Sequence, residues 1–296
     1  MTAAPSRSIA PAHETVDGPP PQVVAVTGAL GGLGASSLLL HVARASAALG
    51  RRVAVLDLEP AGGLGLLLGD EPRPGLRWAD LPADESAFRA ELLVPALPSW
   101  LGLPVLTGDE RGGCANPTQA SAALAALGQD HDLILVDLPR GAEPPPGAEL
   151  LLLTAADLRS AVAAQALAAP LAARCSQGAG STLRLVLREG AHDVTAEDLL
   201  DMTGAEVAAV LPVDRSVAQR VARGDDPTRG RGGARRAARH LAAILAAASD
   251  AEPGGPPPGA PVRLPTRGRG RPVEAMAQGA PADAGPGAVA MARAAR

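Results

Sequence analysis

The stretch that decides the fold runs Val23-Val24-Ala25-Val26-Thr27-Gly28-Ala29-Leu30-Gly31-Gly32-Leu33-Gly34-Ala35-Ser36-Ser37. A short β-branched run leads into a glycine-rich turn, and apolar residues at helical spacing follow the turn. Glycines let backbone N–H groups approach phosphates, the N-terminus of the next helix favours negative charge, and the Ser36 hydroxyl is suited to ligate Mg²⁺. A phosphate loop also needs a lysine beside that hydroxyl, where this chain has Ala35. The stretch therefore predicts a strand–loop–helix unit whose phosphate loop lacks its cation.

Short apolar strands alternate with helices through the rest of the central region. The pattern predicts strands at 23–27, 53–57, 103–107, 132–137, 149–154, 182–187 and 206–211, and helices at 36–49, 118–127, 157–174, 195–202, 215–223 and 234–248. Such alternation is typical of a parallel sheet covered by helices on both faces. Ligands bind at the carboxyl ends of strands in these α/β folds. Asp57 and Asp137 both lie at such ends, which makes them candidate site residues.

Composition limits the domain organisation. The chain has 296 residues, of which 47% are hydrophobic, enough for one α/β domain over residues 22–248. Residues 1–21 and 249–296 are rich in Ala, Pro, Gly and charge without apolar periodicity, so disordered tails are expected there. The two cysteines, Cys114 and Cys175, indicate neither a disulfide framework nor a metal site. No apolar run reaches the length of about 18 residues that a membrane span needs. We expect a cytoplasmic protein with no direct membrane insertion.

Charge is unevenly distributed along the chain. The formal net charge is −4, yet residues 215–240 hold eight arginines and two aspartates. This segment is either a solvated helix face or an attractor of DNA, anionic lipid or an acidic partner. The whole chain has one Phe and two Trp, which argues against stacking on single-stranded nucleic acid.

Three short segments resemble one family of P-loop proteins. They are Gly31-Gly32-Leu33-Gly34-Ala35-Ser36-Ser37, Asp57-Leu58-Glu59-Pro60 and Val136-Asp137-Leu138-Pro139-Arg140, and together they resemble the MinD/ParA family of deviant Walker A ATPases. The segments at 64–69 and 74–81 resemble more specifically the actinobacterial CpaE-like and septum-site-determining (Ssd) proteins. The resemblance, which covers about residues 23–245, implies a P-loop NTPase-like, mostly parallel sheet, ATP with Mg²⁺ as cofactor, and a homodimer.

The resemblance also implies roles for individual residues. Catalytic roles fall on Asp57 and Asp137, and Mg²⁺ contacts fall on Ser36, Asp57 and Asp137. The nucleotide-binding positions are Gly31, Gly32, Leu33, Gly34, Ala35, Ser36, Ser37 and Pro212. Leu30 and Ala35 stand where the family has its signature lysine and its Walker lysine, and Ala29 replaces the first glycine of the loop. Arg188 follows the strand after which the family often has an asparagine at the base pocket.

Each of these residues also has an ordinary structural interpretation. The glycine loop could be a tight strand-to-helix turn, and Asp57 and Asp137 could be strand-end acids that cap the following turns. Arg140 is either a substitute cation for the site or a solvated arginine that pairs with Glu143. His41 and His131 are expected to be structural or exposed, and Cys114 a buried or loop thiol.

The sequence therefore supports a main functional hypothesis with two alternatives. The main hypothesis is a MinD/ParA-like, CpaE-like positioning or regulatory protein for septum placement or Flp/tad pilus secretion. It would bind ATP weakly, hydrolyse little or none, and work with division or secretion proteins that recruit it to the membrane face. The first alternative is a pseudo-ATPase scaffold that works without nucleotide. The second is a ParA-like DNA binder that uses the arginines of Arg220–Arg239.

Overall fold

A computed structural model describes residues 20–69, 74–175, 182–190 and 193–250. Nearly all of the two predicted tails, residues 1–19 and 251–296, lies outside the described residues. The order of secondary-structure elements begins with the strand, loop and helix that the glycine-rich stretch predicts.

The central feature is an eight-stranded sheet formed by the described residues. Its strands are β1 (Gln22–Gly28), β2 (Val53–Asp57), β3 (Ser99–Trp100), β4 (Leu103–Leu106), β5 (Leu133–Asp137), β6 (Glu149–Ala155), β7 (Leu183–Arg188) and β8 (Val207–Leu211). They are ordered β3-β4-β2-β5-β1-β6-β7-β8. Every neighbouring pair is parallel except the short antiparallel pair β3–β4. The chain order reverses around β1, and in α/β sheets such a switch point is where ligands bind.

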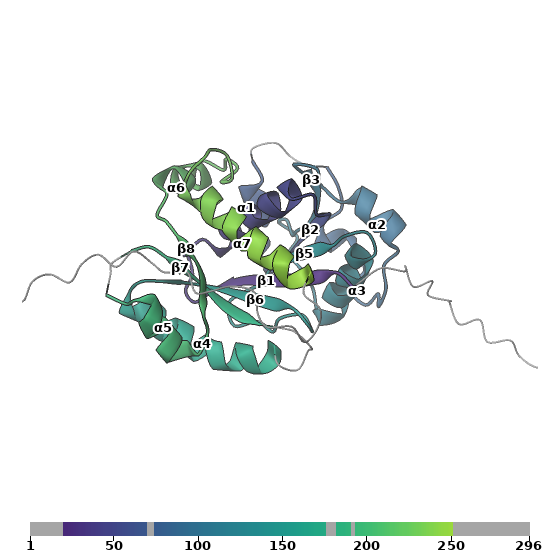
Figure 1. Cartoon of the computed structure of the whole chain (residues 1–296). Coiled ribbons are helices and arrows are strands. Elements are labelled where there is room, and N and C mark those ends of the chain that lie inside the picture. Colours follow the sequence, from purple (N-terminus) through teal and green to yellow (C-terminus); the bar gives the residue numbers. More distant parts are fainter. Residues whose placement is uncertain (1–19, 70–73, 176–181, 191–192, 251–296) are drawn as a thin grey trace, which may run out of the picture. The chain divides into compact units, whose positions relative to one another are not determined.

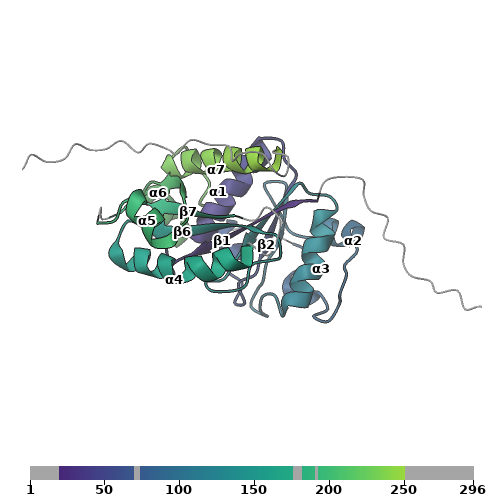
Figure 2. The same ribbon diagram turned by 60° about the horizontal axis from the view of Figure 1, so that its bottom comes forward.

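Helices cover both faces of this sheet (Figures 1 and 2). The helices are α1 (Ala35–Ala48), α2 (Ala90–Ala96), α3 (Pro117–Gly128), α4 (Leu158–Cys175), α5 (Ala196–Thr203), α6 (Arg215–Ala222) and α7 (Gly233–Asp250), with 3₁₀ turns η1 (Leu64–Leu67) and η2 (Trp78–Asp80). One face packs against α1 and α7, and the other against α2, α3, α4 and α5. The predicted α/β fold is therefore confirmed.

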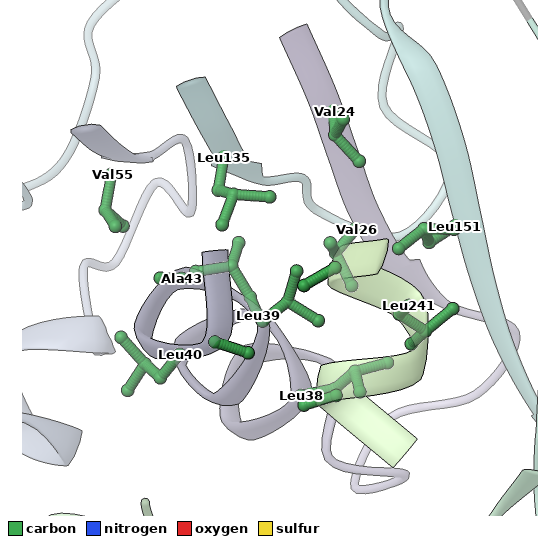
Figure 3. Close-up of a cluster of buried hydrophobic side chains, with 14 of the residues drawn as sticks. Val24, Val26, Leu38, Leu39, Leu40, Ala43, Val55, Leu135, Leu151 and Leu241 are labelled. Atoms are coloured by element: carbon green, nitrogen blue, oxygen red, sulfur yellow. The ribbon is translucent and has the colours of Figure 1, made fainter. Parts of the chain in front are cut away.

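Strand residues alternate between the two faces as the pleat requires. In β1, Val24 and Val26 join the core under α1 and α7, while Ala25 joins the core on the opposite face. Figure 3 shows Leu38, Leu39 and other residues of α1 packed between the strands and Leu241 of α7. Because β1 and α1 are both buried, the loop that joins them is held at both ends.

Besides the 3₁₀ turns η1 and η2, the strand β3 and the helix α2 were not predicted from the sequence. The strand β3 has two residues, too few for a periodic signal, and pairs only with β4. The helix α2 contains Pro95, which removes a backbone donor and disfavours a helical prediction. Both lie away from the glycine loop, so their omission does not affect the expected site.

The packing of α1 predicts a large cost for truncation at its centre. Leu39 is fully buried, and we expect Leu39→Ala to lower the free energy of unfolding by about 2–5 kcal/mol through lost burial and a cavity. Leu49, just beyond the same helix, is 56% exposed, so Leu49→Ala should change it by less than about 0.5 kcal/mol. Urea denaturation measures both, and equal effects of the two substitutions would contradict the burial described here.

Candidate functional site

The glycine loop leaves the start of α1 open. Gly34 is the N-cap of α1 with φ +96°, and no side chain caps the helix there. Among the described residues, the backbone N–H groups of residues 34–37 donate no hydrogen bond. The first amides of a helix normally find a capping side chain, water or a ligand. The start of α1 is therefore a set of free donors at the positive end of a helix dipole, which suits an anion.

Three other helices have a side-chain N-cap. Asn116 caps α3, Thr195 caps α5 and Asp214 caps α6, each by accepting a hydrogen bond from an early backbone N–H of its helix. The helix α2 lacks such a cap, as α1 does, but its N-cap Arg89 is extended, whereas α1 follows a glycine in the left-handed conformation.

Ser36 and Asp137 meet at the carboxyl edge of the sheet. β5 pairs with β1 so that Asp137 lies opposite Val26, which places Asp137 beside the loop. The neighbouring Ser36 hydroxyl favours the ionised form of the Asp137 carboxyl group. Burial nevertheless raises the pKa of Asp137 to about 7, and the charges of Asp57 and Glu59 add to this rise. A cation bound here would relieve that cost, because it would favour the carboxylate.

Asp57 is engaged in the structure in a different way. Its Oδ1 accepts the N–H of Glu59 at 3.0 Å, and its Oδ2 accepts the N–H of Leu64 at 3.2 Å and the Thr107 hydroxyl at 2.6 Å. Burial raises the pKa of Asp57, against these three hydrogen bonds. This geometry matches the interpretation of Asp57 as a strand-end acid that caps a turn. A direct role of Asp57 at metal or water stays a prediction.

A cavity of about 510 Å³ opens beside Ser36 and Asp137, within the size range of ligand pockets. It is lined by Ser36, Glu59, Gly62, Gly63, Leu64, Leu66, Leu67, Asp137, Val221 and Gly224. Asp57 is not among the lining residues, although its hydrogen bond to Leu64 shapes the wall. The cavity therefore joins the hydroxyl and acid of the predicted site to the η1 turn and the end of α6.

The oxygens at this edge fit a magnesium ion only in part. Hydroxyl and carboxylate oxygens are ligands that Mg²⁺ prefers, and Mg²⁺ usually keeps waters or phosphate oxygens as further ligands. Within the described residues, no group of three or more His, Cys, Asp or Glu side chains could hold a metal by itself. Ser36 and Asp137 would therefore need a phosphate-bearing ligand to complete the coordination.

Two further residues named from the sequence lie at the ends of β7 and β8. Arg188, the last residue of β7, donates from Nη1 to the carbonyl oxygen of Leu33 at 2.6 Å and less closely to that of Gly32 at 3.4 Å. Pro212 follows β8 and packs at the start of α7, where a Cβ on Gly233 would lie 2.8 Å from the proline Cγ. The sequence placed Arg188 at the end of a strand, where the family often has a base-pocket asparagine, and gave no signal that it bonds to the loop.

The remaining candidates have structural surroundings. His131 is buried and its Nδ1 lies 2.7 Å from the carbonyl oxygen of Leu127. His41 is 5% exposed, burial lowers its pKa to about 4, and its Nε2 has no partner among the described residues. The Cys114 thiol donates to the carbonyl oxygen of Asn116 at 3.3 Å, and burial raises its pKa. These findings agree with the structural interpretations of the three side chains.

The sequence did not identify the partners of Asp57. Thr107 lies at the end of β4, a position that sequence reasoning noted only as a strand end. The Trp78 indole donates to the Asp57 carbonyl oxygen at 2.6 Å. These contacts join segments that are 50 and 21 residues apart, so no local pattern predicts them.

Several known proteins resemble this chain in sequence. Residues 22–200 match the family model described as cellulose biosynthesis protein BcsQ. An uncharacterised protein of Mycobacterium tuberculosis H37Rv is 31% identical over 228 residues, covering 74% of this chain. The alignment spans 63% of that relative, so the chain covers less than two thirds of its length.

Solved structures share the fold at low sequence identity. A ParA family ATPase from Chlorobium tepidum superposes with a TM-score of 0.61 at 17% identity, covering 76% of this chain and 98% of that one. The septum site-determining protein MinD from Pyrococcus horikoshii, complexed with Mg-ADP, gives 0.54 at 17% identity, covering 75% and 94%.

The buried Asp137 predicts an unusual dependence of stability on pH. Its pKa in the folded chain, about 7, lies above the unfolded value of 3.8. The stabilisation from its bound proton is therefore complete at low pH and is lost as pH rises through about 7. We expect Asp137→Asn to stabilise the metal-free protein by roughly 2–4 kcal/mol at pH 8 and to have little effect near pH 4. Urea denaturation in EDTA across this range measures the difference.

Asp132 provides a control of opposite sign. Its hydrogen bonds to Arg52 hold its pKa below the ordinary value, so its stabilisation is present at neutral pH and is lost in acid. Asp132→Asn should therefore destabilise the protein at pH 8. A stabilising effect of Asp137→Asn that does not vary with pH would refute the assignment of the raised pKa to Asp137.

Proposed function

The chain belongs to the BcsQ family of MinD/ParA-type P-loop proteins, and from this premise we propose that it binds ATP weakly with Mg²⁺ and hydrolyses it slowly or not at all. The observation that carries the proposal is the open start of α1 beside the Ser36–Asp137 pair. Free amides favour a polyphosphate, and oxygen ligands beside them favour the cation that accompanies it. In this proposal Gly31–Ser37 hold the phosphates, and Ser36 and Asp137 hold Mg²⁺.

The missing lysines reduce affinity and rate to different degrees. A charge-assisted hydrogen bond to phosphate contributes about 1.5–3 kcal/mol, so its absence at Ala35 weakens binding by about 10- to 150-fold. Phosphoryl transfer depends on cations that stabilise developing charge, and each missing donor costs about 10² to 10³ in rate. Leu30 and Ala35 remove two such cations. We therefore expect this chain to retain nucleotide binding to a greater degree than hydrolysis.

The biological role is proposed by analogy with the family. The P. horikoshii neighbour is a septum site-determining protein solved with Mg-ADP, which supports a nucleotide-dependent positioning or regulatory role. We propose septum placement or Flp/tad pilus secretion as the process, a homodimer as the working form, and proteins of those systems as partners. Among the described residues, no helix is both long and apolar enough to cross a membrane. In this proposal a cytoplasmic protein reaches the membrane face through its partners.

Two observations favour alternatives. Asp57, one of the two predicted catalytic acids, is held by three internal donors, which suits a scaffold that works without nucleotide. Such a scaffold would show no ATP-dependent change in light scattering. Separately, Arg223, Arg229, Arg231, Arg236 and Arg239 are exposed on and between α6 and α7, which suits non-specific DNA contact. Electrophoretic mobility shift at low salt tests that contact, because phosphate-driven binding weakens steeply as salt rises.

Titration with a fluorescent ATP analogue in the presence of Mg²⁺ tests the main proposal. We expect saturable but weak binding by the wild type and about 10- to 150-fold tighter binding by Ala35→Lys, since the lysine restores a charge beside the phosphates. Ala48→Lys is the matched control, because it adds the same charge at the exposed far end of the same helix. It should leave affinity unchanged within about threefold, since exposed charges this far apart are largely screened.

The same titration can overturn the proposal. The absence of saturable binding at millimolar nucleotide would exclude a nucleotide site of the kind described. Equal affinities of the wild type and Ala35→Lys would show that the loop does not contact the phosphates.

A further inference from the structure

Arg188 places a positive charge on the lysine-free loop. Its guanidinium Nη1 lies 2.6 Å from the carbonyl oxygen of Leu33 and 3.4 Å from that of Gly32. It also approaches Gly34, where an added Cβ would lie 3.9 Å from the same nitrogen. Within the described part of the chain, no carboxylate forms an ion pair with Arg188. Its charge is therefore directed at the loop.

The other arginine of β7 shows the contrast. Arg184 donates from Nη1 to the Glu149 carboxylate at 2.6 Å, and this ion pair joins β7 to β6. Arg184 is thus neutralised by its partner, whereas Arg188, four residues further along the strand, bonds to backbone oxygens. The two side chains share a strand and a residue type but differ in what they contact.

The contact of Arg188 with the Leu33 carbonyl oxygen also affects a loop amide, because the two groups belong to the same peptide. A trans peptide is planar, so its N–H points away from its carbonyl oxygen. The carbonyl of Leu33 shares a peptide with the N–H of Gly34, one of the free donors at the start of α1. Because Arg188 holds this carbonyl oxygen, the Gly34 N–H points away from the Arg188 guanidinium. A cation on the oxygen also polarises the peptide and strengthens that N–H as a donor.

We propose that Arg188 is the positioning cation of this loop, which orients and polarises its backbone amides for a polyphosphate in place of the missing lysines. The proposal rests on the function proposed above. It assigns Arg188 to the backbone of the phosphate loop, although Arg188 lies where the family resemblance places a base contact. The ligand class that follows is any triphosphate, whatever its base.

Isothermal titration calorimetry with ATP, GTP and inorganic triphosphate, each with Mg²⁺, tests this assignment. We expect Arg188→Met to weaken all three by a similar factor of about 10 to 100, because the loop amides lose the charge-assisted hydrogen bond that orients and polarises them. Arg188→Lys keeps the charge and should stay within about fivefold of the wild type. Arg184→Met, on the same strand, should leave all three affinities unchanged. Thermal unfolding of each variant verifies that it is folded.

The outcomes separate this inference from the proposed function. If the wild type binds none of the three ligands at millimolar concentration, the proposed function fails and the role of Arg188 fails with it. If the wild type binds but Arg188→Met binds equally well, only the role of Arg188 is overturned. Loss confined to one nucleotide, with inorganic triphosphate unaffected, would make Arg188 a base contact and would also overturn the proposal. A lysine variant as weak as the methionine variant would exclude the role of charge.

Discussion

The pairing of β1 between β5 and β6 is the constraint on which the rest of this structure depends. It buries β1 on both edges and both faces, and α1 packs its leucines against the same strands. The glycine loop therefore joins two elements that are both packed into the core. Its backbone can adopt positive φ at Gly32 and Gly34 because glycine has no Cβ, and the packed strand and helix fix the two ends of the loop.

The candidate site has a positive side and a negative side, formed by different chemical groups. Backbone amides supply the positive side at the start of α1, and the buried Asp137 supplies the negative side at the end of β5. Neither side is satisfied by the chain alone, since α1 lacks a cap and Asp137 is costly to ionise. A ligand that binds only the folded form stabilises it through mass action. A bound metal–polyphosphate would satisfy both sides at once.

Much of the fold could be predicted from the sequence, because short apolar strands and helical spacing are local signals. Asp57 and Asp137 could be placed at one edge because parallel strands end together. The contact of Arg188 with Leu33 could not be predicted, since it joins residues 155 apart and requires β7 to lie two strands from β1, with β6 between them. The hydrogen bond between Asp57 and Thr107 could not be predicted either, because Thr107 follows another strand. Side-chain identity indicated the site, whereas long-range geometry decides what each residue does there.

The two indoles of the chain differ in a way that reports on this edge of the sheet. Trp78 donates its N–H to the backbone of Asp57, while Trp100 is fully buried and its Nε1 has no partner among the described residues. Indole emission depends on polarity and on hydrogen bonding, so the two side chains form distinct fluorophores. With no tyrosine in the sequence, ultraviolet emission comes almost entirely from this pair. A displacement of the end of β2 changes the emission of Trp78, so intrinsic fluorescence reports structural changes beside Asp57.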